Sequence, residues 1–478
     1  MPVERTRDKD KMEAKELIDR LKEIVDPEFV LSSEMDLALY SYDASLEKAV
    51  PDVVVLPAST EEVARIMTLA HEEKVPILGR GSGTNLTGGT IPVAGGIVVH
   101  FSRMNHILEI DTANRTATVE PGVITLDLQT EVMKQGFIYQ PDPASQKVST
   151  LGGNVGENSG GPHCLKYGVT SNHILGLEIV LNDGTVIMTG GKSRENPGYD
   201  LAGLLVGSEG TLGLVTKMIL KLERAPEAVK TMLAIYETIE DGANTVSAII
   251  AEGIVPATLE MMDNTVMRAV EETIKVGYPL DAAAVLIIEL DGMPEGMDEK
   301  AAKVMEICKR NNVREVKLAK NEAERNILWA GRKGAFGAVG QVRPSYLCCD
   351  GTVPRTKLPE VLSQVIEIGR KYHLPIGNVF HAGDGNLHPL IMFDERDENE
   401  LQRVHKASTE ILKLCADAGG TISGEHGVGL EKLRETCFIF NESDLDLERS
   451  IRKAFDPDEI LNPGKMIPDE PCRQALGL

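Results

Sequence analysis

The sequence lacks long apolar stretches. It contains no run of about 18 apolar residues, and residues 1–16 carry charges of both signs without an apolar core. A membrane-spanning helix requires such a run, and a secretory signal peptide requires a short apolar core after a basic start. We therefore expect no signal or transit peptide, no integral membrane segment and a cytoplasmic location.

Cysteine is scarce and scattered. The seven cysteines form no C-x-x-C pair, and only Cys348 and Cys349 are adjacent. Iron–sulfur clusters are held by sets of about four thiolates, and no such set is visible in the sequence. We expect reduced thiols, so any electrons that the protein collects must leave through another protein or molecule.

Basic residues are too few to balance the acidic ones. Lys and Arg number 50 against 73 Asp and Glu, which gives a net charge of −23. Such a chain repels polyphosphate backbones and anionic membranes, so we expect no nucleic-acid binding. Low-complexity tracts are also absent, and the 42% of hydrophobic residues is a globular value. A length of 478 residues then predicts two or three domains.

Glycine is concentrated in three polar loops of the first half, at residues 79–89, 150–161 and 207–215. Glycine lets several backbone N–H groups approach a diphosphate, and three such loops suit a long dinucleotide better than a single phosphate. Thr84 and Leu86 interrupt the glycine spacing of a Rossmann motif. Tight structural turns are the alternative interpretation.

The pattern of predicted elements changes at residues 225–227. Before this point we predict short strands and helices, including a helix with a capping box formed by Ser59 and Glu62, and a hairpin around Asn182-Asp183-Gly184. After it, longer helices are expected at 258–276 and 299–311. The other predicted elements are helices at 12–25 and 125–134 and strands at 53–57, 75–78, 96–101, 107–110 and 116–120.

Two histidines and a Glu-His pair form the strongest candidate reaction site. His381 and His388 lie seven residues apart, and Glu425 precedes His426. On one straight strand the two imidazoles would point to opposite faces, but Gly383-Asp384-Gly385 predicts a turn that lets them converge. His, His and Glu are the ligands expected of a divalent metal with open positions, which leaves His426 as a base. A buried hydrogen-bonded network without metal is the alternative.

Several longer motifs follow one another in order. The first half contains Pro57-Ala58-Ser59-Thr60-Glu61-Glu62-Val63, Arg80-Gly81-Ser82-Gly83-Thr84, Thr150-Leu151-Gly152-Gly153-Asn154, Gly198-Tyr199-Asp200-Leu201 and Gly207-Ser208-Glu209-Gly210-Thr211-Leu212-Gly213. The second half contains Trp329-Ala330-Gly331-Arg332-Lys333-Gly334-Ala335-Phe336, Asp350-Gly351-Thr352-Val353-Pro354-Arg355, the segment from His381 to His388, Gly424-Glu425-His426-Gly427 and Asn462-Pro463-Gly464-Lys465.

The first set resembles the FAD-binding domain shared with vanillyl-alcohol oxidase and p-cresol methylhydroxylase. The second set resembles the D-lactate dehydrogenase and glycolate oxidase catalytic-subunit family. This resemblance covers about residues 12–470 and implies an α+β fold. The implied parts are an N-terminal helical segment (1–49), a two-subdomain FAD-binding domain of the p-cresol methylhydroxylase type (50–225), an α+β substrate or cap domain with the metal site (226–429), and a C-terminal helical segment that packs back on the FAD domain (430–478).

The resemblance also assigns roles to the candidate site residues. Arg332 would clamp a substrate carboxylate through its bidentate fork, and His426 would be the catalytic base. A divalent ion (zinc, iron or manganese) would be held by His381, His388 and Glu425.

FAD is expected to bind without a covalent link, because residues 79–89 contain no histidine. His163 and Cys164 are interpreted as packing residues, and a covalent link to the flavin through either of them is the alternative. The residues expected to contact FAD are Arg80, Gly81, Ser82, Gly83, Thr84, Asn85, Gly88, Pro141, Asp142, Gly152, Gly153, Asn154, Asn158, Gly161, Gly210 and Val215.

The implied activity is FAD-dependent oxidation of a D-2-hydroxy acid to the 2-keto acid, by hydride transfer to flavin N5. D-lactate is the expected substrate, followed by glycolate. Electrons would pass to an electron-transferring flavoprotein or to an iron–sulfur subunit. Two other classes stay open from the residues alone: a metal-dependent hydrolase of a phosphorylated substrate, and a flavin-binding electron carrier without a substrate site.

Overall fold

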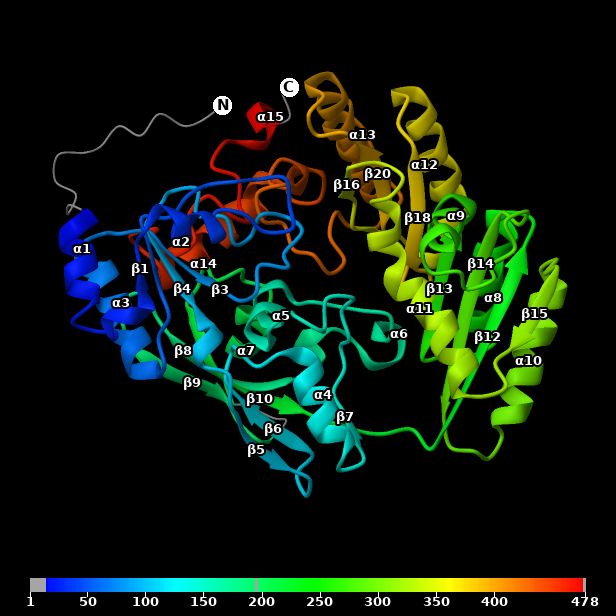
Figure 1. The fold of residues 1–478 in the computed structure, drawn as a ribbon, viewed down its shortest axis with the longest axis horizontal. Helices are drawn as coiled ribbons and strands as arrows, with labels where there is room; N and C mark the ends of the chain where they lie inside the picture. Colours follow the sequence, from blue (N-terminus) through cyan, green and yellow to red (C-terminus); the bar gives the residue numbers. More distant parts are fainter. Residues whose placement is uncertain (1–13, 194–196, 476–478) are drawn as a thin grey trace.

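The computed structural model describes residues 14–193 and 197–475, which form two α+β halves side by side (Figure 1). The first half, on the left in Figure 1, contains two sheets and a small two-stranded one, and the second half, on the right, contains one large sheet. Strands and helices are mixed in both halves, which confirms the expected α+β class. Within the described ranges, no helix is both long and apolar enough to cross a membrane.

The first sheet has the order β1-β2-β4-β3, in which β2, β4 and β3 are parallel. Helix α3 covers this sheet and begins after Ser59, whose hydroxyl accepts a hydrogen bond from the Glu62 N–H, so the predicted N-cap is confirmed. The predicted capping box is incomplete, because the Glu62 carboxylate accepts from the Ala58 N–H instead of from Ser59. The bounds are β1 Val30–Leu31, β2 Val53–Val55, β3 Ile77–Arg80, β4 Ile97–His100, α1 Ala14–Leu21, α2 Glu34–Leu39 and α3 Thr60–Glu72.

The second sheet is antiparallel, with the order β5-β6-β10-β8-β9. The predicted hairpin is confirmed, since Val180 of β8 pairs with Val186 of β9. The bounds are β5 Ile107–Asp111, β6 Thr116–Val119, β7 Phe137–Ile138, β8 Ile174–Val180, β9 Val186–Gly190, β10 Leu214–Lys221, β11 Glu223–Arg224, α4 Thr125–Met133, α5 Leu151–Glu157, α6 Cys164–Tyr167 and α7 Leu201–Leu205.

The second glycine-dense segment is not a loop throughout. Residues 151–157 form helix α5, which begins after Thr150, and the Thr150 hydroxyl accepts from the Gly153 N–H. A side chain at Gly152 would place its Cβ 2.6 Å from the Cβ of Pro121. Glycine is therefore present here because the helix packs closely on the neighbouring chain, which local sequence patterns do not reveal.

The third sheet fills the second half, with the order β15-β12-β14-β13-β18-β19-β17 and with β16 and β20 attached beside β18. Alternate residues of β12 point into two cores: Met232 and Ala234 pack under α8, α10, α12 and α13, while Leu233 and Ile235 pack under α9 and α11. The strands are β12 Ala228–Tyr236, β13 Thr258–Asp263, β14 Ala284–Gly292, β15 Glu315–Leu318, β16 Ser345–Cys348, β17 Gly351–Thr352, β18 Ile376–His381, β19 Asn386–Leu387 and β20 Pro389–Phe393. The helices are α8 Ile239–Ala251, α9 Asn264–Thr273, α10 Met297–Arg310, α11 Glu322–Val339, α12 Leu358–Tyr372 and α13 Glu398–Asp417.

The predicted helix at 258–276 is wrong in its first part. Residues 258–263 are the central strand β13, and only α9 that follows is helical. Leu259, Glu260 and the two methionines favour helices, and no glycine or proline separates the strand from α9, so the local sequence does not mark where the strand ends. Asp263 ends the strand and caps α9, since its carboxylate accepts from the Val266 N–H.

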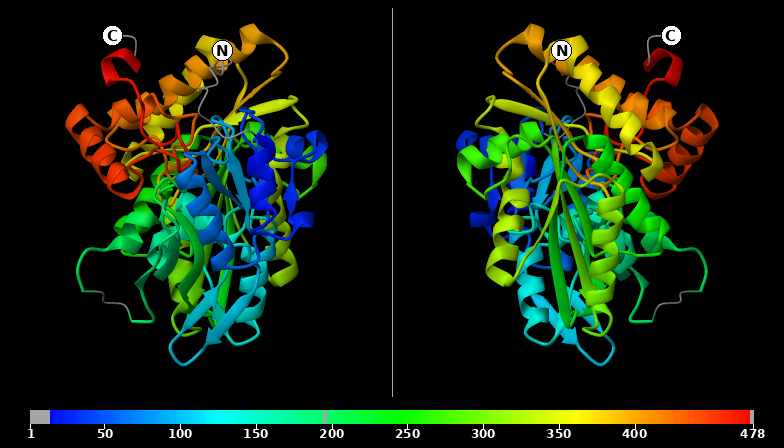
Figure 2. Two further views of the ribbon diagram at one scale, coloured as in Figure 1. Left: turned by 90° about the vertical axis from the view of Figure 1, so that its left-hand side faces the viewer. Right: turned by 90° about the vertical axis from the view of Figure 1, so that its right-hand side faces the viewer.

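The C-terminal segment returns to the first half and lies along one side of the molecule, in orange and red in Figure 2. Leu461 forms a bridge with Ile77 of β3, and both are buried in the core under the first sheet. The segment contains α14 Glu442–Phe455 and α15 Cys472–Ala475.

One expectation about cysteine is wrong in the structure. Cys437 and Cys472 form a disulfide, with their Cα atoms 5.4 Å apart, while the other five cysteines are free. The two cysteines are 35 positions apart, the segment between them includes α14, and the chain after this helix folds back beside residues 437–440. Spacing in the sequence gives no sign of this return.

Candidate active site

One cavity of about 560 Å³ joins the glycine-rich segments of the first half to the histidine cluster of the second half. Its walls include Gly81 and Asn154 on one side, and Arg332, His388 and His426 on the other. The two groups of candidate residues are thus brought together in a single space.

The residues expected to contact FAD fall into three sets. Those that line the main cavity are Gly81, Ser82, Gly83, Thr84, Asn85, Asp142, Gly153 and Asn154. Those in a recess of about 80 Å³ are Arg80, Gly152, Gly210 and Val215, together with Gly81 and Gly153. Gly88, Pro141, Asn158 and Gly161 line neither space. Asn158 instead ends α5 and accepts a hydrogen bond from the Ser171 N–H.

Two glycines show how closely the cavity walls approach each other. A Cβ added at Gly81 would lie 2.2 Å from the Thr150 hydroxyl oxygen, and one at Gly160 would lie 2.5 Å from Oε2 of Glu425. A larger residue at either position would have to displace the Thr150 or Glu425 side chain, and at Gly160 the first half directly touches the cluster of the second half. A cavity that is lined by the glycine-rich segments and continues to the histidine cluster has room for a dinucleotide cofactor.

The side chain of Arg80 forms hydrogen bonds with other residues of the protein. Its guanidinium donates to the carbonyl of Tyr42 at 2.6 Å and to the hydroxyl of Thr90 at 3.2 Å, and it is 5% exposed. Asn85 similarly shapes the loop, because its Oδ1 accepts from the N–H groups of Thr87 and Gly89. Any diphosphate in this loop would therefore meet backbone N–H groups more than the Arg80 charge.

The histidine cluster converges on one carboxylate oxygen. Oε1 of Glu425 lies 3.2 Å from Nε2 of His381, 3.0 Å from Nε2 of His388 and 3.5 Å from Nε2 of His426. The His381 and His388 rings are nearly perpendicular, whereas the His388 and His426 rings are stacked. The turn between β18 and β19 contains Gly385 with φ +76° and folds the two histidines together.

His388 has the geometry of a ligand. It is 1% exposed, yet neither ring nitrogen has a hydrogen-bond partner among the described residues, because its contact with Glu425 has the length but not the direction of a hydrogen bond. A buried polar atom without a partner is costly, and a metal ion would satisfy it. The ligand atoms of His381, His388 and Glu425 all lie within 4.8 Å of one another, which fits a single divalent ion.

Cys348, His388 and His426 form a second set with the same spacing, but this set fits an ion less well. The planes of the two rings are only 10° apart, so their nitrogens point in parallel instead of toward one point. Burial and the nearby Asp350 raise the pKa of the Cys348 thiol well above its usual value, which disfavours the thiolate that metals bind.

The electrostatics favour a positive charge between two carboxylates. Burial opposes the charge on His381, but Glu260 and Glu425 outweigh it and raise the pKa of the His381 imidazole to about 10. Burial likewise opposes the charge on Glu425, but His381 and the other imidazoles hold the pKa of the Glu425 carboxyl well below its usual value. A cation, either a proton or a metal ion, is stabilised at this point.

Arg332 lies on α11 and faces the same cavity. Its Nε donates to Oε2 of Glu260 at 2.7 Å, while Oε1 of Glu260 lies 2.8 Å from Nδ1 of His381. The terminal Nη groups of Arg332 have no partner among the described residues. The arginine is therefore fixed through Nε and presents its remaining donors to the cavity, as a carboxylate clamp requires.

The loop with Glu425 and His426 is fastened to the first half as well. The carboxylate of Glu209 accepts from the N–H groups of Val428 and Gly429, and the Thr87 hydroxyl donates to the His426 carbonyl. Glu209 and Thr87 belong to the third and first glycine-rich segments. The loop thus bridges the two halves.

His163 is an ionic contact between the halves. Its Nδ1 lies 2.8 Å from the carboxylate of Asp142 and its Nε2 lies 3.6 Å from that of Glu289. Burial opposes its charge, but Asp142 and Glu289 raise the pKa of His163 to about 10. A protonated ring held on both sides is not a nucleophile, so His163 is unsuited to a covalent flavin link.

Sequence reasoning missed Glu260 and the buried Asp350. Both carboxylates are completely buried against the cluster, and neither belongs to a pattern with known ligand spacing. The walls formed by Phe336 and Tyr346 were also missed, although Phe336 stands one helical turn after Arg332 and so lies on the same face of α11.

Comparison with known proteins places these features in a family. Residues 51–190 match the FAD binding domain, and residues 225–466 match the C-terminal domain of FAD linked oxidases. The chain is 46% identical over 467 residues to the glycolate oxidase subunit of Bacillus subtilis (strain 168), covering 97% of this chain and 99% of that protein. It is 32% identical over 467 residues to the D-lactate dehydrogenase of Anaerostipes hadrus, and the match covers 94% of this chain and 97% of that protein.

Among solved structures, p-cresol methylhydroxylase has the same fold, with a TM-score of 0.80 over 94% of this chain and 96% of that chain at 18% identity. This likeness supports the expected fold of the FAD-binding half. With its two matched domains and its full-length relatives, the chain belongs to the FAD-linked oxidase family and is an FAD-dependent oxidoreductase.

Proposed function

We propose that this enzyme oxidises a small 2-hydroxy acid to the 2-keto acid, with electrons passing first to FAD and then to a partner protein. The observation that carries the proposal is the single cavity that contains the glycine-rich walls, Arg332 and the histidine cluster. A cofactor and a carboxylate-bearing substrate have room to meet there. The full-length relatives named for glycolate and D-lactate act on acids of this class.

Arg332 binds and orients the substrate carboxylate. Two parallel N–H···O bonds from its Nη groups match two carboxylate oxygens, and Glu260 keeps the guanidinium plane in place. His426 takes the hydroxyl proton at Nε2, the ring nitrogen on the side of Glu425. His381, His388 and Glu425 hold a divalent ion. When bound, that ion would supply a positive charge that polarises the substrate oxygens, and FAD would supply the acceptor for the two electrons and the hydrogen lost from C2.

The wall beside Arg332 favours a small group at C2. Phe336 and Tyr346 have their ring centroids 6.1 Å apart, and Phe336 lies 6.3 Å from the His388 ring. An apolar wall accommodates a hydrogen atom or a methyl group and disfavours a charged tail. This supports glycolate and D-lactate. The higher identity to the glycolate oxidase subunit supports glycolate as the first candidate, whereas the sequence motifs alone favoured D-lactate.

A partner accepts the electrons from reduced FAD. The described residues include five free cysteines and one disulfide, and no group of possible metal ligands among them contains more than one cysteine, so they provide no four-thiolate set for an iron–sulfur cluster. We therefore propose an electron-transferring flavoprotein or an iron–sulfur subunit as the acceptor. The word subunit in the name of the Bacillus subtilis relative supports a multiprotein arrangement.

Anaerobic mixing tests the substrate class. The purified protein, with its FAD, is mixed with glycolate, D-lactate, L-lactate or D-2-hydroxyglutarate, and the flavin absorption band is followed. Rapid bleaching by glycolate or D-lactate, with slower bleaching by the other two, is expected. A yellow protein that none of these acids bleaches would favour the electron carrier without a substrate site.

A further inference from the structure

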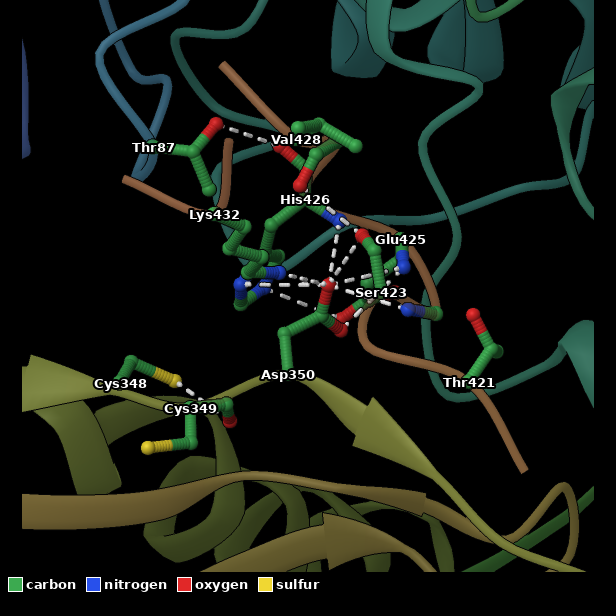
Figure 3. Close-up of polar contacts among 12 residues, drawn as sticks. Thr87, Cys348, Cys349, Asp350, Thr421, Ser423, Glu425, His426, Val428 and Lys432 are labelled. Atoms are coloured by element: carbon green, nitrogen blue, oxygen red, sulfur yellow. Dashed lines mark hydrogen bonds and ion pairs between the residues drawn. The ribbon is translucent and has the colours of Figure 1, made fainter. Parts of the chain in front are cut away.

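Asp350 lies at the centre of the cluster without facing the cavity. It follows β16, is 0% exposed and accepts hydrogen bonds from one short loop (Figure 3). Its carboxylate oxygens accept from the Ser423 hydroxyl at 2.8 Å and from the backbone N–H groups of Gly424, Glu425 and His426 at 3.1, 3.2 and 3.0 Å. Three consecutive N–H groups therefore surround one carboxylate.

These N–H groups belong to the residues whose side chains do the proposed chemistry. Because the backbone N–H groups of Glu425 and His426 are fixed on Asp350, the directions of both side chains are fixed with them. Asp350 also lies 3.9 Å from Nδ1 of His388 and 3.9 Å from Nδ1 of His426, on the side of these rings away from Glu425. The buried Asp350 carboxylate thus contacts both the backbone of the loop that carries Glu425 and His426 and the rings of His388 and His426.

Lys432 supplies the opposite charge. Its Nζ donates to Oδ2 of Asp350 at 3.0 Å, and both side chains are fully buried. A buried ion pair gives little net stability compared with apolar residues, because both charges lose their hydration. A gain in stability therefore does not account for the Asp350–Lys432 pair. Holding the loop 423–427 in one conformation does account for it.

We propose that Asp350, neutralised by Lys432, is a positioning residue that sets the loop 423–427 so that Glu425 can bind the metal ion and His426 can act as the base. The inference rests on the proposed function, since it assumes these roles for Glu425 and His426. It adds a residue that never touches the substrate and acts only through its neighbours.

The test is Asp350→Asn in the FAD-loaded protein, because asparagine keeps the size of the side chain but replaces one acceptor with a donor that opposes the loop N–H groups. We expect roughly a 10- to 100-fold loss in zinc or manganese affinity and a similar fall in kcat, with FAD content unchanged and KM changed less. Metal content per flavin, measured by elemental analysis, is the readout besides activity.

The matched control is Asp263→Asn. Asp263 is equally a buried aspartate of the second half, and it accepts from the backbone of Val266 and Asn378, away from the loop. A general effect of losing a buried carboxylate would lower Tm in both variants, whereas the proposal predicts that only Asp350→Asn loses metal. If Asp350→Asn does not fold, Ser423→Ala removes one donor from the same carboxylate and should weaken metal binding several-fold.

Full metal content and wild-type kcat in Asp350→Asn, or in Ser423→Ala if that variant replaces it, would overturn the inference while leaving the proposed function standing. If the wild-type protein bound no divalent ion and the His426→Ala variant kept the wild-type rate, the proposed function would be overturned, and this inference with it.

Discussion

At the scale of single residues, Glu260 explains why Arg332 can serve as a clamp deep in the protein. A buried guanidinium needs a counter-charge, and Glu260 provides it at Nε without occupying the Nη groups. The same carboxylate orients His381 through Nδ1. The proposed clamp and the proposed metal ligand are thus held by one side chain.

Replacing Arg332 by lysine should weaken substrate binding without loss of FAD. Lysine keeps the charge but loses the fork, and charged hydrogen bonds contribute about 1.5–3 kcal/mol, so KM should rise roughly 10- to 100-fold. FAD and metal content should stay unchanged. Steady-state kinetics with glycolate or D-lactate measure the effect. Lys309→Gln, at an exposed lysine of α10 that does not line the cavity, is the control and should stay close to wild type. An unchanged KM in Arg332→Lys would show that Arg332 does not bind the substrate carboxylate.

The base is tested by His426→Ala. Loss of a general base typically lowers the rate roughly 10²- to 10⁴-fold, so anaerobic flavin reduction should slow by this amount while the protein stays yellow. His405→Ala, an exposed histidine on α13, serves as the control. Reduction at the wild-type rate in His426→Ala would show that another group takes the proton.

At the scale of elements, the turn between β18 and β19 brings His381 and His388 together. Gly385 has φ +76°, and a Cβ there would lie 2.1 Å from the Val353 carbonyl oxygen. Gly385→Ala should therefore displace the turn, lower Tm and reduce metal content. Gly253 has the same φ of +76°, but a Cβ there would have no atom within 4 Å. Gly253→Ala is therefore the control, because it introduces the backbone strain without the clash. Equal metal content in the two variants would show that the turn is not needed for the ligands to meet.

Elements with local causes were predictable from the sequence. The Ser59 cap and the Asn182-Asp183-Gly184 hairpin depend on neighbours in the chain, and the structure contains both. Strand β13 was mistaken for a helix because its leucine, glutamate and methionines favour helices and no glycine or proline separates it from α9.

The candidate site was predictable only where its residues are close in sequence. The turn between His381 and His388 follows from its glycines. Asp350 reaches Glu425 across 75 residues, and Glu209 reaches Gly429 across 220. Such contacts depend on how whole sheets pack, which no local pattern specifies. The Cys437–Cys472 pair has the same origin.

At the scale of the whole molecule, the ionic group around His163 joins the two halves beside the cavity. His163 connects Asp142 of the first half with Glu289 of the second, and Glu289 also accepts from Arg325 and from the Trp329 indole. Trp329 precedes Arg332 by one helical turn on α11. Relative placement of the flavin half and the clamp therefore depends on this junction.

The junction predicts a pH-dependent stability. The pKa of His163 is about 10 in the folded protein against 6.5 for a free imidazole, so its contribution is complete below pH 6.5 and is lost as the pH rises toward 10. The Tm difference between wild type and His163→Gln should be largest near pH 6 and smallest near pH 10. His106→Gln, at an exposed surface ion pair, should change Tm little at any pH. A Tm difference for His163→Gln that grows with pH would contradict the charged junction.

The most direct test of the account is the rate of anaerobic flavin reduction by glycolate or D-lactate before and after removal of divalent ions. We predict that the chelated protein keeps its FAD but is reduced roughly 100-fold or more slowly, and that zinc, manganese or iron restores the rate. Reduction at the full rate by protein verified to be free of metal would contradict the claim that the histidine cluster and the flavin act on one substrate.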